Sequence, residues 1–356
     1  MARKKVTMEQ IANSAGVSKY VVSKTLNGKP GVSEKTRKKI LYIAQQLGYD
    51  NFTIEYENKR PSQATKETQF MLCVIPNRQY QDEAMYWAKV LEGISQGSDE
   101  NDIGLVIVTE KQPYREMVNV ESIYGIIGVG KLSEEVLINL KQLAVPMVLV
   151  DHDDPLISVD CIFKDNFEGV NKLTKHLITL EHKHFAFVGD LNHSQSFYDR
   201  WLGFRTAIEQ HGNLMLKEPL SFSYSDSMKE EIHQWIKNEG EKSSEHFPTA
   251  FVCANDDIAS VLMSELKAFG YQVPEDCSVT GFDNVDFSLY TNPPLATIQV
   301  LKEAIGKRSV TKLIWRKNNP DAPKEKLLLR GEMIIRGSVD VSPDTKGEEK
   351  ADGKTK

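Results

Sequence analysis

The sequence lacks any run of about 18 apolar residues, the length that a membrane-spanning helix needs, so we expect no transmembrane helix. The basic segment Met1–Met8 lacks the apolar stretch of a secretory signal peptide, which favours a cytoplasmic protein. Cysteine is scarce, because the 356 residues contain only four and no two form a Cys-x-x-Cys pair. Three of the four lie in apolar, strand-like runs, so we expect buried thiols rather than disulfides or a zinc site.

The sequence also lacks an even distribution of charged residues along its length. The net charge is −6, but residues 1–50 hold ten Lys and Arg against three acidic residues, a balance of +7. The other 306 residues must then carry −13. A basic head (residues 1–50) on an acidic body (the other 306 residues) indicates a module that binds a polyanion, joined to a part of the protein with a different role. The length allows about two or three domains.

The basic head predicts three short helices, of which the first two form a helix-turn-helix pattern. Thr7 and Gln10 match a capping box ahead of a first helix at Met8–Ala15. Ser18 and Ser33 are suited to cap the second and third helices. In this motif, polar and cationic side chains of the second helix reach base edges in the major groove. The alternative is a small solvated bundle with a basic surface.

Beyond a polar linker at 51–69, strand-like apolar runs alternate with helical patterns. This alternation predicts an α/β fold, and its length suggests two doubly wound parallel sheets. The predicted strands are Met71–Ile75, Gly104–Thr109, Tyr124–Val129, Pro146–Asp151, His184–Asp190, Thr249–Asn255 and Ser278–Asp283. The predicted helices are Glu83–Glu100, Ser133–Leu143, Asn166–Leu180, Gln195–His211, Met228–Asn238 and Asp257–Phe269. Residues 338–356 have no apolar period and predict a disordered tail.

Motifs spread along most of the chain closely resemble those of the lactose/galactose-repressor (LacI/GalR) family. In the head they are Val6–Ala12, Ala15–Ser18, Val22–Gly28, Val32–Arg37 and Leu47–Tyr49. In the body they are Phe163–Asn166 with Gly169, Arg200–Phe204, Ala254–Asp256, Thr280–Asn284, Pro293–Ile298 and Arg336–Ser338. The resemblance thus runs from about Lys5 to Ser338.

This resemblance implies a dimeric DNA-binding repressor, with no enzymatic activity, no cofactor and no metal. An all-α helix-turn-helix head at 1–50 would be joined to a periplasmic-binding-protein-like core at 70–337, whose two lobes close on a small molecule. The core would bind effector and form the dimer. The resemblance places its N-lobe at about 70–161 and 292–321, and its C-lobe at about 162–291 and 322–337.

The resemblance also implies which head residues contact double-stranded operator DNA. The predicted DNA-binding residues are Thr7, Ser18, Lys19, Tyr20, Ser23, Lys24 and Asn27. Lys19, Tyr20 and Lys24 lie where the family reads base edges, and the two serines lie nearer the phosphates. Val21 stands where a Thr is usual, which removes a hydroxyl contact. Lys24 replaces the usual Arg, and lysine cannot make a planar bidentate contact.

The predicted linker departs from the family. Family members commonly continue with an Ala-Arg-x-Leu helix whose Leu wedges into the minor groove. No such motif occurs here, and Glu55 and Glu57 would lie unfavourably beside phosphate. Ile54 or Tyr56 could still act as a wedge. We expect a reduced or absent minor-groove kink.

Four residues of the body are predicted to bind the effector by their match to the family. Arg200 can donate to a ligand hydroxyl or carboxylate. Asn255 and Asp283 follow predicted strands, where ligands gather in open α/β sheets, and together they could hold vicinal sugar hydroxyls. Tyr224 could stack on the ligand. The alternatives are a surface Arg200, helix caps at Asn255 and Asp283, and a core position for Tyr224.

Other candidates have structural interpretations. Asp256 is expected to cap the following helix. Trp87 and Trp201 could line a pocket, but aromatic residues within helices are normally part of the core. His182 and His184 resemble half of a metal site, but no third ligand has a fitting spacing, so surface histidines are expected.

Two formal motifs of enzymes are rejected. Gly93–Gly97 matches Gly-x-Ser-x-Gly, but the serine lies within a predicted helix and not at a strand-to-helix turn. Gly125–Lys131 matches most of a phosphate-binding loop, but Leu132 stands where a hydroxyl must meet Mg²⁺, and the supposed loop is itself a predicted strand.

The sequence therefore predicts a homodimeric repressor whose operator binding is controlled by a small polar metabolite, most simply a sugar or sugar derivative. A nucleobase or a protein co-regulator could take the place of the sugar. A cytoplasmic sugar-binding protein and an α/β enzyme are the other classes, which the head and the rejected motifs disfavour.

Overall fold

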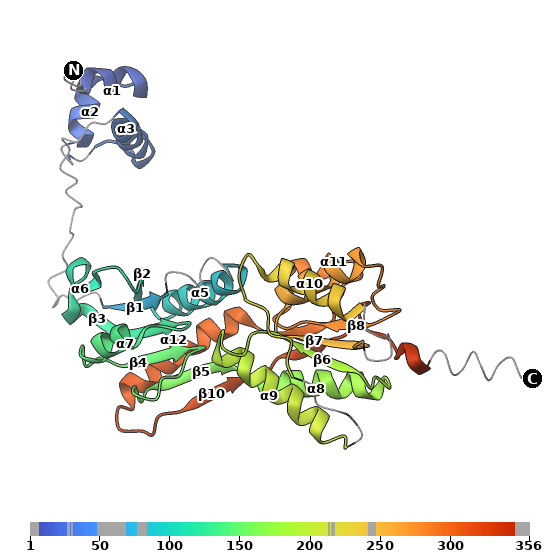
Figure 1. Ribbon diagram of the computed structural model, residues 1–356. Helices are drawn as coiled ribbons and strands as arrows, with labels where there is room; N and C mark the ends of the chain where they lie inside the picture. Colours follow the sequence, from blue (N-terminus) through green and yellow to red (C-terminus); the bar gives the residue numbers. More distant parts are fainter. Residues whose placement is uncertain are drawn as a thin grey trace, which may run out of the picture. The chain divides into compact units, whose positions relative to one another are not determined.

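The computed structural model describes residues 7–26, 29, 31–47, 69–76, 84–212, 214, 218–240 and 247–345. The chain divides into two compact units, Met1–Lys66 and Glu67–Lys356 (Figure 1). Asn27 and the linker, with its predicted wedge residues and acids, lie outside the described residues except for Gln69. Within the described part, every helix is too short or too polar to cross a membrane.

The first unit contains the three helices that the sequence predicts. They are α1 (Met8–Ala15), α2 (Lys19–Leu26) and α3 (Glu34–Leu47). Their buried core consists of Ile11, Ala12, Ala15, Val22, Leu26, Ile40 and Ala44. Thr7 and Gln10 form the predicted capping box, and Gly16 ends α1 with φ of 67°. The helix-turn-helix geometry thus rests on local capping and on one small apolar core.

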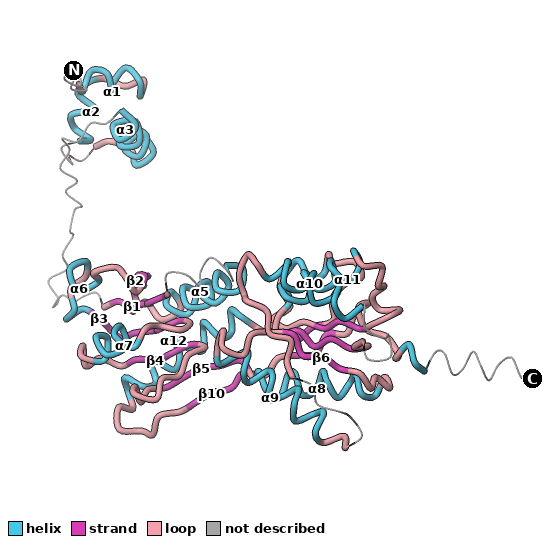
Figure 2. Tube along the Cα trace, in the orientation of Figure 1, coloured by secondary structure: helices cyan, strands magenta, loops and turns pink. Residues whose placement is uncertain are grey.

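The second unit contains two parallel sheets, drawn in magenta in Figure 2. The first has the order β10-β5-β4-β3-β1-β2. Its strands are β1 (Phe70–Ile75), β2 (Gly104–Thr109), β3 (Ile123–Val129), β4 (Met147–Val150), β5 (Asp160–Lys164) and β10 (Lys326–Leu329). Its helices are α5 (Ala84–Asp99), α6 (Tyr114–Met117), η1 (Val120–Ser122), α7 (Glu134–Lys141) and α12 (Lys302–Asn318). Met71 and Cys73 belong to the buried cluster of α5 and α12, whereas Leu72 and Val74 belong to that of α7, so both faces are covered.

The second sheet is smaller and has the order β6-β7-β8, again parallel. Its strands are β6 (Phe185–Val188), β7 (Ala250–Cys253) and β8 (Ser278–Thr280). The helices of this lobe are α8 (Asn166–Thr179), α9 (Gln195–Glu209), α10 (Met228–Gly240), α11 (Asp256–Ala268) and η3 (Asp286–Leu289). The four cysteines are buried thiols, as predicted.

Three chain segments connect the lobes, and they lie next to one another. The first runs from β5 to α8, where the Asp165 amide donates to the carbonyl oxygen of Leu329 at 2.8 Å. The other two contain β9 (Thr297–Gln299) and β11 (Glu332–Ile334), which pair antiparallel. A hinge motion between the two lobes would therefore have to bend the chain at these three adjacent segments.

The predicted lobe boundaries need correction. We expected the C-lobe to begin at 162 and again at 322, but β5 and β10 pair with each other in the first sheet. We also expected 292–299 in the N-lobe, but Ala296 bridges Thr280 at the edge of the second sheet. The strands near these boundaries are three to five residues long, too short for a periodic signal.

The chain does not become a disordered tail at residue 338. The Ser338 hydroxyl donates to the carbonyl oxygen of Val279 at 2.6 Å, and the Ser342 amide donates to that of Leu180 at 2.9 Å. Both serines are fully buried. Polar residues that are hydrogen-bonded within the second lobe produce no apolar period, which is why the sequence pattern missed them. Residues 346–356 lie outside the described part.

The glycines of α5 explain the Gly-x-Ser-x-Gly pattern. A Cβ at Gly93 would overlap the backbone of Glu303 in α12, and a Cβ at Gly306 would overlap the carbonyl oxygen of Val90. The two helix backbones therefore cross in close contact, which only glycine permits. As predicted, Ser95 lies within a helix and not at a nucleophile elbow.

This packing yields a stability prediction. Gly306→Ala should lower the free energy of unfolding of the second unit by about 2 kcal/mol or more, because the added methyl group forces α5 and α12 apart. Gly212→Ala is the matched control, since nothing lies within 4 Å of its added Cβ. The control should change the free energy by less than about 0.5 kcal/mol, measured by urea unfolding. Equal losses in the two variants would contradict the close crossing.

Candidate functional site

The outward face of α2 carries the predicted base-reading residues. Val22 and Leu26 face the core, which leaves Lys19, Tyr20 and Lys24 away from it. Tyr20 is 72% exposed, so its ring and hydroxyl lie on the surface of the head. This face can therefore offer a phenol and two ammonium groups to a groove.

Contacts within the head hold some of these side chains. The Lys19 ammonium pairs with Glu9 Oε2 of α1 at 3.6 Å. The Lys24 ammonium lies 5.8 Å from the centre of the Tyr20 ring. The Thr7 and Ser18 hydroxyls accept hydrogen bonds from the Gln10 and Val21 amides, so both act as helix caps. Their predicted DNA contacts, and that of Ser23, remain predictions.

A cavity of about 300 Å³ lies between the two lobes of the second unit. The first lobe contributes Trp87, Lys131, Asp151, His152 and Lys164 to its wall, and the second contributes the start of α9 and Arg200. The segment that matched a phosphate-binding loop is β3 followed by Gly130, whose φ of 72° turns the chain so that Lys131 reaches the wall. Of the four predicted effector residues, only Arg200 lines the cavity.

Arg200 is fully buried, so the alternative of a surface residue was wrong. Its Nε donates to Asn166 Oδ1 at 2.9 Å, and its Nη1 donates to the carbonyl oxygen of Ala254. Its Nη2 lies 3.5 Å from Asp283 Oδ1. The guanidinium stacks on the Phe282 ring at 3.9 Å. These contacts hold the guanidinium in one orientation at the edge of the cavity.

Lys164, which was not among the predicted effector-binding residues, joins the two lobes. It ends β5 of the first lobe, and its ammonium lies 3.3 Å from Asp151 Oδ2 and 3.4 Å from Asp283 Oδ1. It also lies 3.9 Å from the centre of the Tyr86 ring, whose hydroxyl donates to Asp151 at 2.7 Å. Its position at the carboxyl end of a parallel strand was the available sequence signal.

Asp283 is the common partner of Lys164 and Arg200, and it is no helix cap. Burial alone would raise the pKa of its carboxyl group, but Lys164, Arg200 and Lys302 outweigh this and hold the pKa below its usual value. Its φ of 102° and the φ of 49° at Asn284 are strained for residues other than glycine. Lys302 stabilises this turn by donating to the carbonyl oxygens of both residues.

Asn255 and Tyr224 lie behind the wall of the cavity. Asn255 is the N-cap of α11, since its Oδ1 accepts from the Ile258 amide at 3.0 Å, so the capping alternative is confirmed. Its amide also donates to the Tyr224 hydroxyl, which in turn donates to Asp257 Oδ2, both at 3.0 Å. The Tyr224 ring lies 4.6 Å from that of His193, which lines the cavity. Both residues thus support the wall.

Asp256 is not the cap that we expected, because the cap position belongs to Asn255. Its carboxylate accepts from the Thr297 hydroxyl at 2.6 Å and from the Val285 amide at 2.9 Å. Burial raises the pKa of this carboxyl group to about 7, an effect that the Thr297 hydrogen bond partly offsets and the nearby Asp283 charge increases. Asp256 ties α11 to the crossover strand β9.

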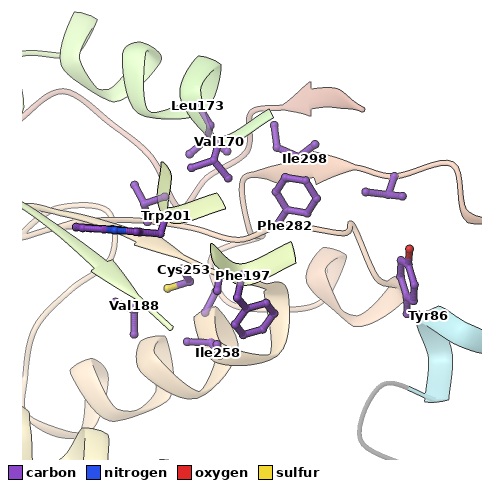
Figure 3. Close-up of a cluster of buried hydrophobic side chains, with 14 of the residues drawn as sticks. Tyr86, Val170, Leu173, Val188, Phe197, Trp201, Cys253, Ile258, Phe282 and Ile298 are labelled. Atoms are coloured by element: carbon purple, nitrogen blue, oxygen red, sulfur yellow. The ribbon is translucent and has the colours of Figure 1, made fainter. Parts of the chain in front are cut away.

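The two tryptophans differ. Trp201 lies in the buried apolar cluster drawn in Figure 3 and is a core residue, as expected. Its ring centre lies 5.5 Å from those of Phe187 and Phe204. Trp87 is also a buried core residue, as expected, but it lines the cavity as well. His182 is also not on the surface, because it is buried and bonded to Thr249 at 3.0 Å. The described residues contain no cluster of His, Cys, Asp and Glu suited to a metal ion.

Three buried polar atoms of the cavity wall have no hydrogen-bond partner among the described residues. They are Trp87 Nε1, Asp151 Oδ1 and His152 Nε2. Burial lowers the pKa of His152, which favours the neutral ring. Buried polar atoms are normally satisfied, so an exception at a cavity marks a place where a ligand can bind. The arrangement offers donors and acceptors for binding and no nucleophile paired with a base.

The chain matches known proteins along nearly its whole length. Residues 7–51 match the bacterial regulatory proteins of the lacI family, and residues 174–339 match the periplasmic binding protein-like domain. The probable HTH-type transcriptional repressor ExuR of Bacillus subtilis (strain 168) is 27% identical over 347 residues, covering 94% of this chain and 98% of the relative. The HTH-type transcriptional repressor PurR of Aliivibrio fischeri (strain MJ11) is 28% identical over 346 residues, with the same coverage.

Solved structures share the fold. The transcriptional regulator CelR–cellobiose complex has a TM-score of 0.64 at 20% identity and covers 94% of this chain and 100% of its own. The lac repressor dimer bound to operator and the anti-inducer ONPF has a TM-score of 0.62 at 22% identity and covers 95% and 100%. Residues 7–51 thus form a lacI-family DNA-binding head, joined to a periplasmic-binding-protein-like core, and the chain is a DNA-binding transcription regulator and not an enzyme.

Proposed function

We propose that this regulator represses transcription as a homodimer, and that a small polar metabolite bound in the cavity between the lobes controls its affinity for operator DNA. The observation that carries the proposal is the set of three unpartnered polar atoms on the wall of that cavity. Operator DNA would be bound through α2, in the bacterial cytoplasm where such DNA lies. The lac repressor, a structural neighbour, was solved as a dimer on its operator.

A sugar or sugar derivative is the effector class that the lining favours. Carboxylate, ammonium and indole N–H groups surround the space, and a polyol can hydrogen-bond to all three. The structural neighbour CelR holds cellobiose, and a neighbour from Enterococcus faecium holds ribose. A nucleobase remains the second candidate, because several relatives are named PurR. No described feature singles out a protein co-regulator.

The role of α2 gives a prediction about operator binding. Lys24→Ala should weaken binding to an operator selected from random DNA by the full-length protein, by about 1–3 kcal/mol, and should relax the base preference at one position. Lys39→Ala is the matched control, because Lys39 is an exposed lysine of α3 outside the α2 face. It should lower specific and non-specific binding alike. Gel-shift titrations on specific and scrambled DNA measure both effects, and equal loss of specificity in the two variants would refute the assignment.

The unpartnered indole N–H gives a prediction about the effector. Trp87→Phe keeps the aromatic contact but removes one donor, so effector affinity should fall roughly fivefold, or about 1 kcal/mol, with operator affinity unchanged. The effector is first chosen as the metabolite that most raises the melting temperature of the full-length protein. Trp315→Phe, in α12 and 37% exposed, is the control and should leave both affinities unchanged. An unchanged effector affinity in Trp87→Phe would contradict the placement of the site.

A further inference from the structure

The two lobes contribute different kinds of polar group to the wall of the cavity. The predicted effector-binding residues Arg200, Tyr224, Asn255 and Asp283 all belong to the second lobe, and their polar groups have partners within the protein. In contrast, the three buried polar atoms of the wall that have no partner among the described residues all belong to the first lobe. The unsatisfied part of the wall therefore lies on one lobe only.

The second lobe supplies residues 191–198 and Arg200 to the wall. All three nitrogens of the Arg200 guanidinium are engaged within the protein. The Ser194 hydroxyl caps α9, and the Ser196 hydroxyl accepts a hydrogen bond at 3.2 Å from the side chain of the first residue of α8. The side-chain amide of Gln195 donates at 2.7 Å to a carboxylate one turn further along α9. The fold has thus already used these polar side chains.

Asp151, in the first lobe, is held so that one carboxylate oxygen is left for the cavity. It follows β4, and its φ of 54° lies in the left-handed region, a strain that is typical of ligand sites. Its Oδ2 accepts from the Tyr86 hydroxyl at 2.7 Å and lies 3.3 Å from the Lys164 ammonium. Its Oδ1 is buried and has no partner in the described part of the chain. The two contacts of Oδ2 fix the orientation in which Oδ1 meets a ligand.

Trp87 and His152 lie next to this carboxylate. Trp87 follows Tyr86 in α5 and packs edge-on against its ring at 4.8 Å, and His152 follows Asp151 directly. The unpartnered indole N–H can only donate, whereas the unpartnered Nε2 of His152 donates or accepts according to the tautomer. Burial lowers the pKa of His152, which favours the uncharged ring. One acceptor, one donor and one atom that can be either therefore gather at one part of the wall.

This set of atoms suits hydroxyl groups. A hydroxyl both donates and accepts, so the hydroxyls of one ligand can satisfy the carboxylate, the indole and either tautomer of the imidazole. An ionised carboxylate has no hydrogen to donate to Asp151 Oδ1, and its charge would repel that of the aspartate. The ligand group at this part of the wall is therefore expected to be uncharged.

We propose that the first lobe selects the effector through Asp151, Trp87 and His152, which bind hydroxyl groups on an uncharged face of the ligand, while the second lobe encloses it by contact. This inference rests on the proposed function, because it assigns recognition within the same cavity. His152 is then a specificity-determining residue. The selecting residues lie on the opposite lobe from the four that the sequence predicted.

The test starts with titrations of the full-length protein by calorimetry. The probes are D-glucose, D-galactose, D-ribose, cellobiose, D-glucuronate and hypoxanthine. D-glucose and D-glucuronate form a matched pair that differs in charge. We expect an uncharged sugar to bind most tightly, and that sugar is then used with all variants.

Variants of the first lobe should weaken the binding of this sugar. In Asp151→Asn the amide oxygen is kept by Tyr86 and Lys164, so an NH₂ group replaces the acceptor, and the dissociation constant should rise about tenfold or more. His152→Phe leaves the partners of Asp151 in place, removes Nε2 and should raise the dissociation constant about fivefold. His152→Gln, whose amide can donate and accept, should restore it to within about threefold.

Variants of the second lobe provide the matched comparison. Asn192 and Gln195 are exposed residues that line the same cavity from the other side. Asn192→Ala and Gln195→Ala should each change the dissociation constant of the sugar by less than about twofold. A loss confined to the first-lobe variants, with rescue by His152→Gln, supports the inference.

Four results would overturn it. These are a loss in either second-lobe variant as large as that in Asp151→Asn, unchanged binding in Asp151→Asn or His152→Phe, tightest binding by D-glucuronate or hypoxanthine, and no binding by any of the six probes. In each case an intact specific gel shift would leave the operator function standing. The absence of any specific shift would instead refute the proposed function itself.

Discussion

The buried ionic cluster of Asp283, Lys164 and Arg200 is the interaction on which the arrangement of the two lobes depends. Lys164 comes from the first sheet, whereas Arg200 and Asp283 come from the second lobe. Burying charges costs free energy that only good pairing and further hydrogen bonds can offset. Among the described residues Asp283 is the carboxylate that pairs with Arg200, whose other partners are neutral, so removal of Asp283 would leave the buried guanidinium charge uncompensated. The lobes are therefore joined by a contact that tolerates few alternatives.

The same cluster connects the cavity with the crossovers. Lys164 and Arg200 line the cavity, while Asp283 bridges Gln299 of the crossover strand β9 and sits in a strained turn. Lys302, at the start of α12, holds that turn from the first lobe. A ligand that displaces either lining cation thus acts directly on the residue that links the lobes. Two-lobed proteins respond to ligands by small changes at such connections.

Much of the fold could be predicted from the sequence, because most helices and strands depend on local signals. The capping box at Thr7 and the apolar strand runs predicted their elements to within a few residues. The lobe boundaries failed, since β9 and β11 are three residues long and polar residues such as Ser338 are fixed by distant partners. Such long-range pairing leaves no periodic trace in the sequence.

The site was predicted less well, for a related reason. Arg200 was identified as a cavity residue, but Asn255 and Asp283 were assigned to the ligand although their polar groups are engaged by a helix end and by two cations. Lys164 was missed because a lysine after an apolar strand is normally solvated. Which polar group is left for a ligand depends on which partners the fold has already supplied, and the sequence motif does not contain that information.

The net charge of the chain likewise does not determine the charge that surrounds the cavity. Outside residues 1–50 the chain carries −13, but this total does not give the charge that surrounds the cavity. Surface charges are screened over about 8 Å at physiological salt, whereas groups inside a partly buried cavity interact through a medium of low polarity. The charged groups at the wall of the cavity, together with Asp283 behind it, therefore determine the potential that a ligand meets. Asp151 and Asp153 pair with Lys164 and Lys326, and Asp283 pairs with Lys164 and Arg200, so each of these carboxylates already has a cationic partner.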